Sequence, residues 1–244
     1  MRLERFVSHA LELPRRRARE LILSGGISVD GCVERRPAAR VAGDATVTCR
    51  GEDIAPPGDL YLMLHKPCGL VSATRDDLHG TVLSLLPGNL ARRVHPVGRL
   101  DKDTSGLLLL TSDGGWSHRI TSPRHACRKV YRATLAESLT SDAEERLAHG
   151  LLLRNETRRT RPAVLHRLAD DEVLIGVTEG RYHLIRRLFG ALGNRVTALH
   201  RQQVGGLVLD RALQPGQWRH LSDDECRQAL ATGAESANLL ETIA

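Results

Sequence analysis

The segment Gly98-Arg99-Leu100-Asp101-Lys102-Asp103-Thr104-Ser105-Gly106 runs directly into Leu107-Leu108-Leu109-Leu110-Thr111 and then Ser112-Asp113-Gly114. Four consecutive leucines bounded by turn residues are too short for an independent helix, and they predict a strand buried on both faces. The polar loop before them is therefore fixed to a rigid core. With glycines on either side and Arg99 nearby, this loop can hold the Asp101 carboxylate at a cleft edge, as a catalytic acid or nucleophile requires.

Two other interpretations of this loop come from its residue types. Asp101, Asp103 and Ser105 match the first half of a calcium-binding loop. However, Ser112 stands where a bidentate Glu is required, and leucines fill the second half, so we reject calcium. A solvated loop, in which Asp and Ser bond only their own backbone, remains open on composition alone.

The complete string, from Gly98 to Gly114, closely resembles the catalytic motif of pseudouridine synthases of the RsuA type. The resemblance implies that Asp101 is the catalytic carboxylate and acts at the ribose of the target nucleotide. It leaves two roles open for Asp101, a covalent nucleophile or a base that removes a sugar proton. It also implies that Arg99, beside it, contacts RNA.

The first fifty residues predict two helices and a small sheet. Apolar residues recur at helical spacing from Leu3 to Leu11, and a second helix follows Pro14 and ends near Gly25. Short alternating segments separated by turn residues predict strands at 27–29, 33 and 45–48, with turns at Asp30-Gly31 and Gly43-Asp44.

The second of these helices carries Arg15, Arg16, Arg17 and Arg19. By pattern alone, such a charged face is as often merely solvated as it is a binding surface. Residues 1 to about 50 together resemble an S4 RNA-binding domain, and this implies that the four arginines contact RNA. Pro14 departs from the resemblance, because it stands where a Ser commonly caps the second helix.

Residues 51–59 contain Pro56-Pro57 and two glycines, so we expect a linker there. Residues 60–231 would form the catalytic domain and 232–244 a loose tail. We expect one helix capped by Asp113, one that begins with a capping box at 141–144, and one from 222 to about 231 that begins with a second capping box. We also expect a short helix or turn at 81–86 and strands at 60–64, 129–135, 162–168 and 172–178. The fold class is α+β, and the resemblance implies a mixed, mostly antiparallel sheet flanked by helices.

Two further segments carry residues to which the resemblance assigns roles. Tyr131 has an ordinary interpretation as a half-buried strand aromatic, but in the family the Tyr of Lys-x-Tyr stacks on the target base, and Arg128 and Lys129 would contact phosphates. Lys66 belongs to the family's Lys-Pro-x-Gly stretch and either supports the fold or contacts RNA.

The segment Gly180-Arg181-Tyr182-His183-Leu184-Ile185-Arg186-Arg187 begins a helix whose apolar residues share one face, with Arg186 at its border. It resembles the family's third signature, whose first basic residue pairs with the catalytic Asp. The resemblance gives Arg186 this role, in which it would keep Asp101 ionised and oriented, and makes Arg187 an RNA contact. Leu184 replaces the family's Gln and Leu188 its Met.

Composition limits the remaining possibilities. The 244 residues carry a formal net charge of +6, and only Lys66, Lys102 and Lys129 of the 35 basic residues are Lys, so an anionic partner is plausible. The five cysteines lack any Cys-x-x-Cys spacing, which indicates reduced thiols in a cytoplasmic protein. The histidines lack the spacing of zinc sites, so we expect no metal. No apolar run is long enough to span a membrane.

Taken together, these features predict an rRNA pseudouridine synthase that requires no cofactor. The resemblance implies uridine 516 of 16S rRNA as the target and 16S rRNA or the immature small ribosomal subunit as the partner, with the protein acting as a monomer. Two alternatives stay open, a synthase of the same superfamily that acts on 23S rRNA and a non-catalytic rRNA-binding or assembly protein. Intact Asp101, Tyr131 and Arg186 argue against the second.

Overall fold

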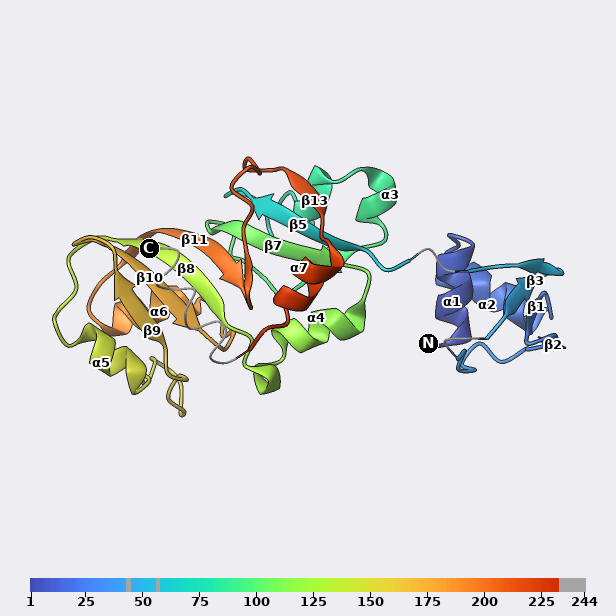
Figure 1. Ribbon diagram of the computed structural model, residues 1–244, viewed down its shortest axis with the longest axis horizontal. Helices are drawn as coiled ribbons and strands as arrows, with labels where there is room; N and C mark the ends of the chain where they lie inside the picture. Colours follow the sequence, from blue (N-terminus) through green and yellow to red (C-terminus); the bar gives the residue numbers. More distant parts are fainter. Residues whose placement is uncertain (43–44, 56–57, 233–244) are drawn as a thin grey trace. The chain divides into compact units, whose positions relative to one another are not determined.

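A computed structural model of the chain describes residues 1–42, 45–55 and 58–232. It divides into two units, Met1–Asp59 and Leu60–Ala244, and each is described by itself (Figure 1). The turn expected at Gly43-Asp44, the Pro56-Pro57 part of the linker and the tail from residue 233 onward lie outside the described residues.

The first unit contains a helix pair and a four-stranded antiparallel sheet of order β2-β1-β3-β4. Its elements are α1 (Leu3–Ala10), α2 (Arg15–Leu23), β1 (Ile27–Val29), β2 (Cys32–Val33), β3 (Val47–Cys49) and β4 (Glu52–Asp53). The expected helix pair and the Asp30-Gly31 turn are confirmed. The linker does not begin at residue 51, because Glu52–Asp53 pairs with β3 and extends the sheet.

The arginines of α2 lie on its exposed side, whereas Ala18 and Ile22 are fully buried against α1 and the sheet. Two of them also bond within the helix, because Glu20 accepts from Arg16 at 3.1 Å and from Arg17 at 3.0 Å. Pro14 provides no side-chain cap, and its carbonyl instead accepts from the Ala18 N–H at 3.1 Å. The helix therefore forms without the Ser cap that the resemblance led us to look for.

The second unit is built on a nine-stranded sheet whose main path is β13-β5-β7-β11-β8-β10-β9 (Figure 1). Its strands are β5 (Tyr61–Lys66), β6 (His95–Pro96), β7 (Ser105–Thr111), β8 (Lys129–Leu135), β9 (Val164–Arg167), β10 (Glu172–Val177), β11 (Val196–Val204), β12 (Leu207–Val208) and β13 (Trp218–His220). Its helices are η1 (Val82–Leu85), α3 (Gly88–Ala91), α4 (Gly114–Thr121), η2 (Pro123–His125), α5 (Ala143–Ala148), α6 (Leu184–Ala191) and α7 (Asp223–Gln228).

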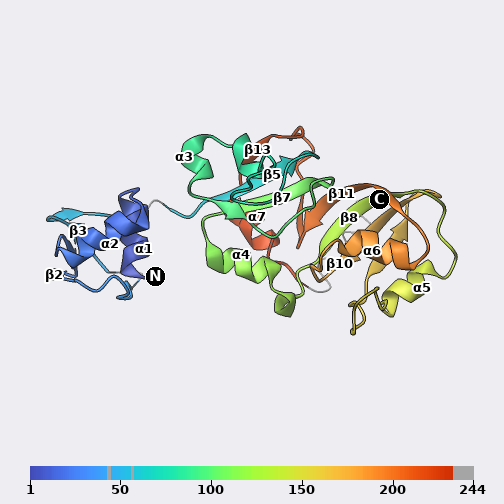
Figure 2. The same ribbon diagram turned by 180° about the vertical axis from the view of Figure 1, so that it is seen from behind.

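The sheet is mixed and mostly antiparallel, as predicted, because only the β7–β11 pair is parallel among the described strands. α6 packs its buried face, including Ile185, Leu188 and Phe189, against one side of β8, β10 and β11 (Figure 2). The shared helical face that the sequence predicts is therefore confirmed, and it fixes α6 beside the strand that carries Tyr131.

The leucine strand is buried on both faces, as predicted. Leu107 and Leu109 of β7 join a core cluster with Trp116 of α4, and Leu108 and Leu110 face the opposite side, where they pack with Val82 of η1. Each of the four leucines is at most 1% exposed. The loop that precedes β7 is therefore attached to a strand that is buried on both faces.

Two of the three predicted helix caps are confirmed. Asp113 accepts from the N–H groups of Gly115 and Trp116, and Ser222 forms a capping box with Glu225. The last helix ends at Gln228, before the expected Ala231. The capping box predicted at 141–144 is wrong, because Asp142 is the N-cap and makes no side-chain cap bond. Its carboxylate instead accepts the Thr140 hydroxyl at 2.5 Å.

Gly106 decides whether β7 and β11 can lie side by side. A Cβ at this position would lie 2.6 Å from the backbone nitrogen of Arg201 and closer still to its carbonyl oxygen, and the φ of Gly106 is +107°. We therefore expect Gly106→Ala to lower the free energy of unfolding by about 3 kcal/mol or more. Gly114→Ala is the matched control, since nothing lies within 4 Å of its Cβ position. Urea unfolding that shows equal stability for both variants would contradict the close approach.

Candidate active site

The loop that carries Asp101 is held mainly by bonds to its backbone. The Lys66 ammonium, at the end of β5, donates to the carbonyls of Asp101 at 3.1 Å, Lys102 at 3.4 Å and Thr104 at 2.9 Å, and to that of Pro67 at 3.0 Å. The Gly69 N–H donates to the Lys102 carbonyl at 2.7 Å. One cation therefore gathers carbonyls from both ends of the loop and fixes its path.

The structure contradicts the expectation that Lys66 contacts RNA and agrees with the alternative, that Lys66 supports the fold. Lys66 is 0% exposed, so no nucleic acid can reach its ammonium without the loop opening. Burial lowers the pKa of this ammonium below its ordinary value. The four carbonyl dipoles replace the water that the charge has lost.

A second pair of bonds holds the residue before Asp101. The Ser72 hydroxyl donates to the Leu100 carbonyl at 3.0 Å and accepts from the Leu100 N–H at 3.1 Å, which reproduces the pairing of a neighbouring strand. The Thr104 N–H then closes a turn on the Asp101 carbonyl at 3.1 Å. These bonds fix the backbone on both sides of Asp101 independently of its side chain.

Asp101 and Tyr131 line the same pocket, which has a volume of about 360 Å³. Asp101 is 28% exposed, so its carboxylate is accessible yet partly shielded from water. Tyr131 lies on β8, and the far wall comes from the segment between β10 and α6. The other charged residues of the lining are Arg99, Lys129, Glu179, Arg181 and Arg201, and His183 also lines the pocket.

The resemblance predicted that Arg186 pairs with Asp101, and this prediction is wrong. Its Nη2 lies 2.7 Å from Oδ2 of Asp103, and its Nη1 donates to the Val196 carbonyl at 3.0 Å. The Asp101–Thr104 turn separates the two carboxylates, so that Asp103 reaches α6 and Asp101 reaches the pocket. The guanidinium therefore anchors the loop at Asp103, two residues beyond the partner that the resemblance implies.

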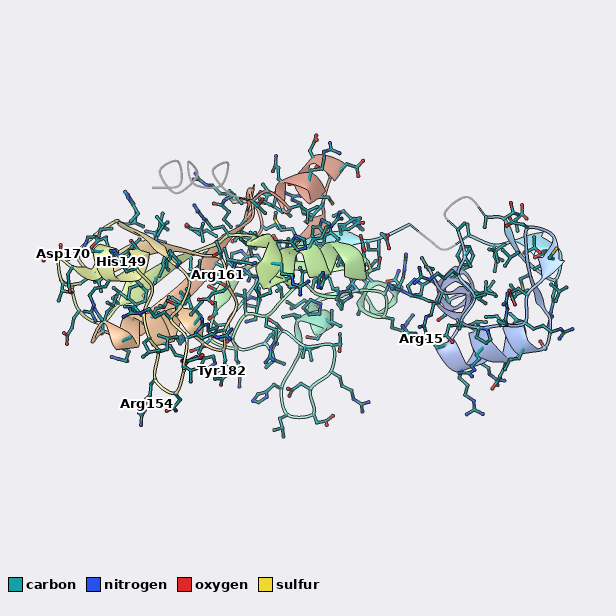
Figure 3. The ribbon with its side chains drawn as sticks, turned by 90° about the horizontal axis from the view of Figure 1, so that it is seen from below. Arg15, His149, Arg154, Arg161, Asp170 and Tyr182 are labelled. Atoms are coloured by element: carbon teal, nitrogen blue, oxygen red, sulfur yellow. The ribbon has the colours of Figure 1, made fainter. Side chains whose placement is uncertain are left out.

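The contact to the Asp101 carboxylate comes from His183, whose Nε2 lies 3.5 Å from Oδ1. His183 is the N-cap of α6 and has a φ of +49°, an unusual backbone conformation that presents its ring to the pocket. Tyr182 stacks on this ring at 3.9 Å between centroids and is 73% exposed at the surface (Figure 3). Sequence reasoning passed over both residues, although they stand within the quoted signature.

The other predicted RNA contacts fall into two groups. Arg99 is exposed at the pocket edge, where a nucleic acid can reach it. The charged groups of Lys129 and Arg187 bond to other groups of the protein. Lys129 donates to the carbonyls of Ile120 and Cys127 at 2.7 and 2.8 Å, and burial lowers its pKa. Arg187 pairs with Glu156 at 2.9 Å, and Arg128 is half-buried.

Arg201 is a pocket residue that sequence reasoning missed. It lies on β11, is only 3% exposed and donates through Nε to the Leu107 carbonyl of β7 at 2.8 Å. Its Nη1 lies 3.5 Å from the Tyr131 hydroxyl. The sequence gives no clear signal for it, because Arg201 stands within the polar run His200-Arg201-Gln202-Gln203.

Neither a metal site nor a membrane span is found within the described part of the chain. No group of three or more His, Cys, Asp or Glu side chains there is arranged to hold a metal ion. None of its helices is long and apolar enough to cross a bilayer. The side chains that line the pocket supply carboxylate, phenol, imidazole, ammonium and guanidinium groups.

Comparisons with known proteins agree with this arrangement. Residues 60–191 match the family model described as RNA pseudouridylate synthase, and residues 1–47 match the S4 domain. The chain is 42% identical over 225 residues to ribosomal small subunit pseudouridine synthase A of Vibrio cholerae, covering 92% of this chain and 97% of that protein. It is 43% identical over 226 residues to the protein of the same name from Escherichia coli K12, covering 92% and 98%.

A solved structure described as a pseudouridylate synthase aligns with a TM-score of 0.70 at 37% sequence identity. The alignment covers 94% of this chain and 99% of that one, so both units take part in it. Since the family model spans more than half of the chain and the relatives span nearly all of it, the chain belongs to the RNA pseudouridylate synthases, a family of RNA isomerases, and carries an S4 domain at its N-terminus.

Proposed function

We propose that this protein isomerises one uridine of 16S rRNA, uridine 516, to pseudouridine, with Asp101 as the carboxylate that acts at the ribose. The observation that carries the proposal is that Asp101 and Tyr131 line one pocket, with Tyr131 on a strand of the sheet. The small-subunit substrate follows from the names of the relatives, which are similar to this chain over nearly their whole length.

The reaction breaks the N-glycosidic bond, turns the detached uracil and rejoins it to the ribose through carbon 5. Breaking that bond builds positive charge on the sugar, which a fixed carboxylate stabilises, as in glycoside cleavage. Tyr131 holds the uracil while it turns. Arg186 acts through its ion pair with Asp103, which keeps the Asp101 loop in place. Since no group is gained or lost and no electron is transferred overall, the reaction requires no cofactor.

A uridine within a helix cannot reach Asp101, so the target nucleotide must be turned out of its stack at a cost of a few kcal/mol. The contacts that offset this cost are proposed to come from two places. Arg99 lies at the pocket edge, and the exposed arginines of α2 in the S4 domain bind the phosphates of neighbouring RNA.

Mapping of pseudouridine across all rRNA, from cells with and without this gene, tests the proposal. We expect a single lost site, uridine 516 of 16S rRNA, and its return when the gene is restored. A lost site in 23S rRNA would assign the protein to the large-subunit alternative. Unchanged modification together with altered subunit assembly would favour the binding-only alternative.

A further inference from the structure

Arg201 is a buried cation without an ion partner. Among the described residues, no carboxylate oxygen lies within 4.0 Å of its guanidinium, and the contacts of that group are the Leu107 carbonyl and the Tyr131 hydroxyl. Removing a charge from water is unfavourable, and an ion pair is the usual compensation. An arginine retained at 3% exposure on the wall of a pocket therefore points to a negative charge that arrives with the substrate.

The sheet places this cation beside Tyr131. Arg201 and Tyr131 are direct cross-strand partners of β11 and β8, so their side chains leave the same face of the sheet next to each other. The register shifts between Arg201 and Gln203, which is the irregularity that often adjusts the aim of a side chain near an active site. The guanidinium carbon lies 5.9 Å from the centre of the Tyr131 ring. A uracil held against that ring is within reach of the guanidinium.

The chemistry of the proposed reaction supplies the missing negative charge. When the bond between ribose carbon 1′ and uracil N1 breaks, its electron pair stays on N1, and the uracil leaves as an anion whose charge spreads to O2 and O4. The positive charge stays on the sugar, where Asp101 is placed to meet it. Transition-state charge of this kind is best stabilised by a preorganised group in a partly dry pocket.

We propose that Arg201 is a catalytic residue that binds a carbonyl oxygen of the detached uracil and stabilises the negative charge formed on the base. This role rests on the proposed function, because it requires that the base held by Tyr131 leaves as an anion. The Nε bond to Leu107 fixes the guanidinium on the pocket wall beside Tyr131, where its remaining N–H groups are available to donate to the base. Asp101 thus stabilises the positive charge on the sugar, and Arg201 stabilises the negative charge on the base.

The test compares Arg201→Met and Arg201→Lys with the wild type under single-turnover conditions at saturating rRNA. Met keeps the length of the stem but not the charge, and we expect a loss of about a hundredfold in rate. Lys keeps the charge, and we expect a loss of about tenfold. The matched control is Arg132→Met, because Arg132 is the next residue on β8 after Tyr131, is exposed and pairs with Glu172 outside the pocket. We expect the rate of this control to stay within about twofold of the wild type.

A second substrate separates this role from a merely structural one. In an rRNA fragment with 5-fluorouridine at the target, the fluorine withdraws electrons and stabilises the departing anion by itself. The rearranged base keeps its fluorine on carbon 5, so the readout is the disappearance of 5-fluorouridine in digests of the fragment. For this substrate we expect the loss caused by Arg201→Met to fall below about tenfold, while its affinity for the rRNA stays within about threefold of wild type.

Equal losses with uridine and 5-fluorouridine would overturn the role of Arg201, as would an Arg201→Met enzyme within threefold of the wild-type rate. If Arg201→Met does not fold, Arg201→Gln supplies the uncharged variant for the same comparison. A wild-type enzyme that changes neither nucleoside would instead contradict the proposed function, and this outcome is distinct from equal losses in an active enzyme.

Discussion

Replacement of Asp101 by Asn is expected to lower the rate of pseudouridine formation by at least about a thousandfold. Asn has nearly the size and shape of Asp, and the bonds that fix the loop involve the backbone of residue 101 rather than its side chain. The substitution therefore removes the negative charge that meets the developing sugar cation and leaves the pocket intact. Release of tritium from rRNA labelled at uracil carbon 5, followed at saturating enzyme, measures the effect.

Asp103→Asn is the control for this prediction, because it makes the same substitution two residues away on the same loop. The Asp103 carboxylate is 66% exposed and pairs with Arg186 rather than facing the base. We expect a loss of no more than about tenfold, since only the anchoring of the loop weakens. The affinity for rRNA should stay within about threefold in both variants. Residual turnover by Asp101→Asn at a tenth of the wild-type rate would exclude Asp101 as the catalytic carboxylate.

Lys66→Met is expected to lower the rate by about a hundredfold, although Lys66 is out of reach of the substrate. Its ammonium is the donor that draws together the carbonyls of Asp101, Lys102 and Thr104. Without it those carbonyls repel one another and the loop relaxes, and a displacement of about 1 Å at a reacting group is enough for an effect of this size. The melting temperature should fall as well, because bonds to a buried charge are lost.

The comparison that decides this prediction is between rate and affinity. A residue that contacts RNA changes the affinity and its salt dependence, whereas a residue that positions the Asp101 loop changes the rate at saturating rRNA. Lys102→Met serves as the control, because Lys102 is an exposed lysine on the same loop. An enzyme that keeps its rate but binds rRNA tenfold more weakly after Lys66→Met would restore the original interpretation of Lys66 as an RNA contact.

Local pattern in the sequence was sufficient to predict most of the helices and strands. Four successive leucines between turn residues favour a strand with two buried faces, and Leu107 to Leu110 are divided between two cores in that way. The helical face of Ile185, Leu188 and Phe189 was equally predictable, because a period of 3.6 residues places them on one side. The capping box predicted at 141–144 was wrong, because the Asp142 carboxylate accepts the Thr140 hydroxyl instead of capping the helix.

The sequence by itself determined the order of the two units, the strand that carries the candidate site and the identity of Asp101 and Tyr131 as the residues to examine. Only the tertiary structure decided which charges meet. Arg186 pairs with Asp103, Lys66 donates to the loop carbonyls, and Arg201 lies on the wall of the pocket beside Tyr131. These partners come from strands and loops far apart in the chain, and the energy of a charge depends on burial and distance rather than on its neighbours in sequence.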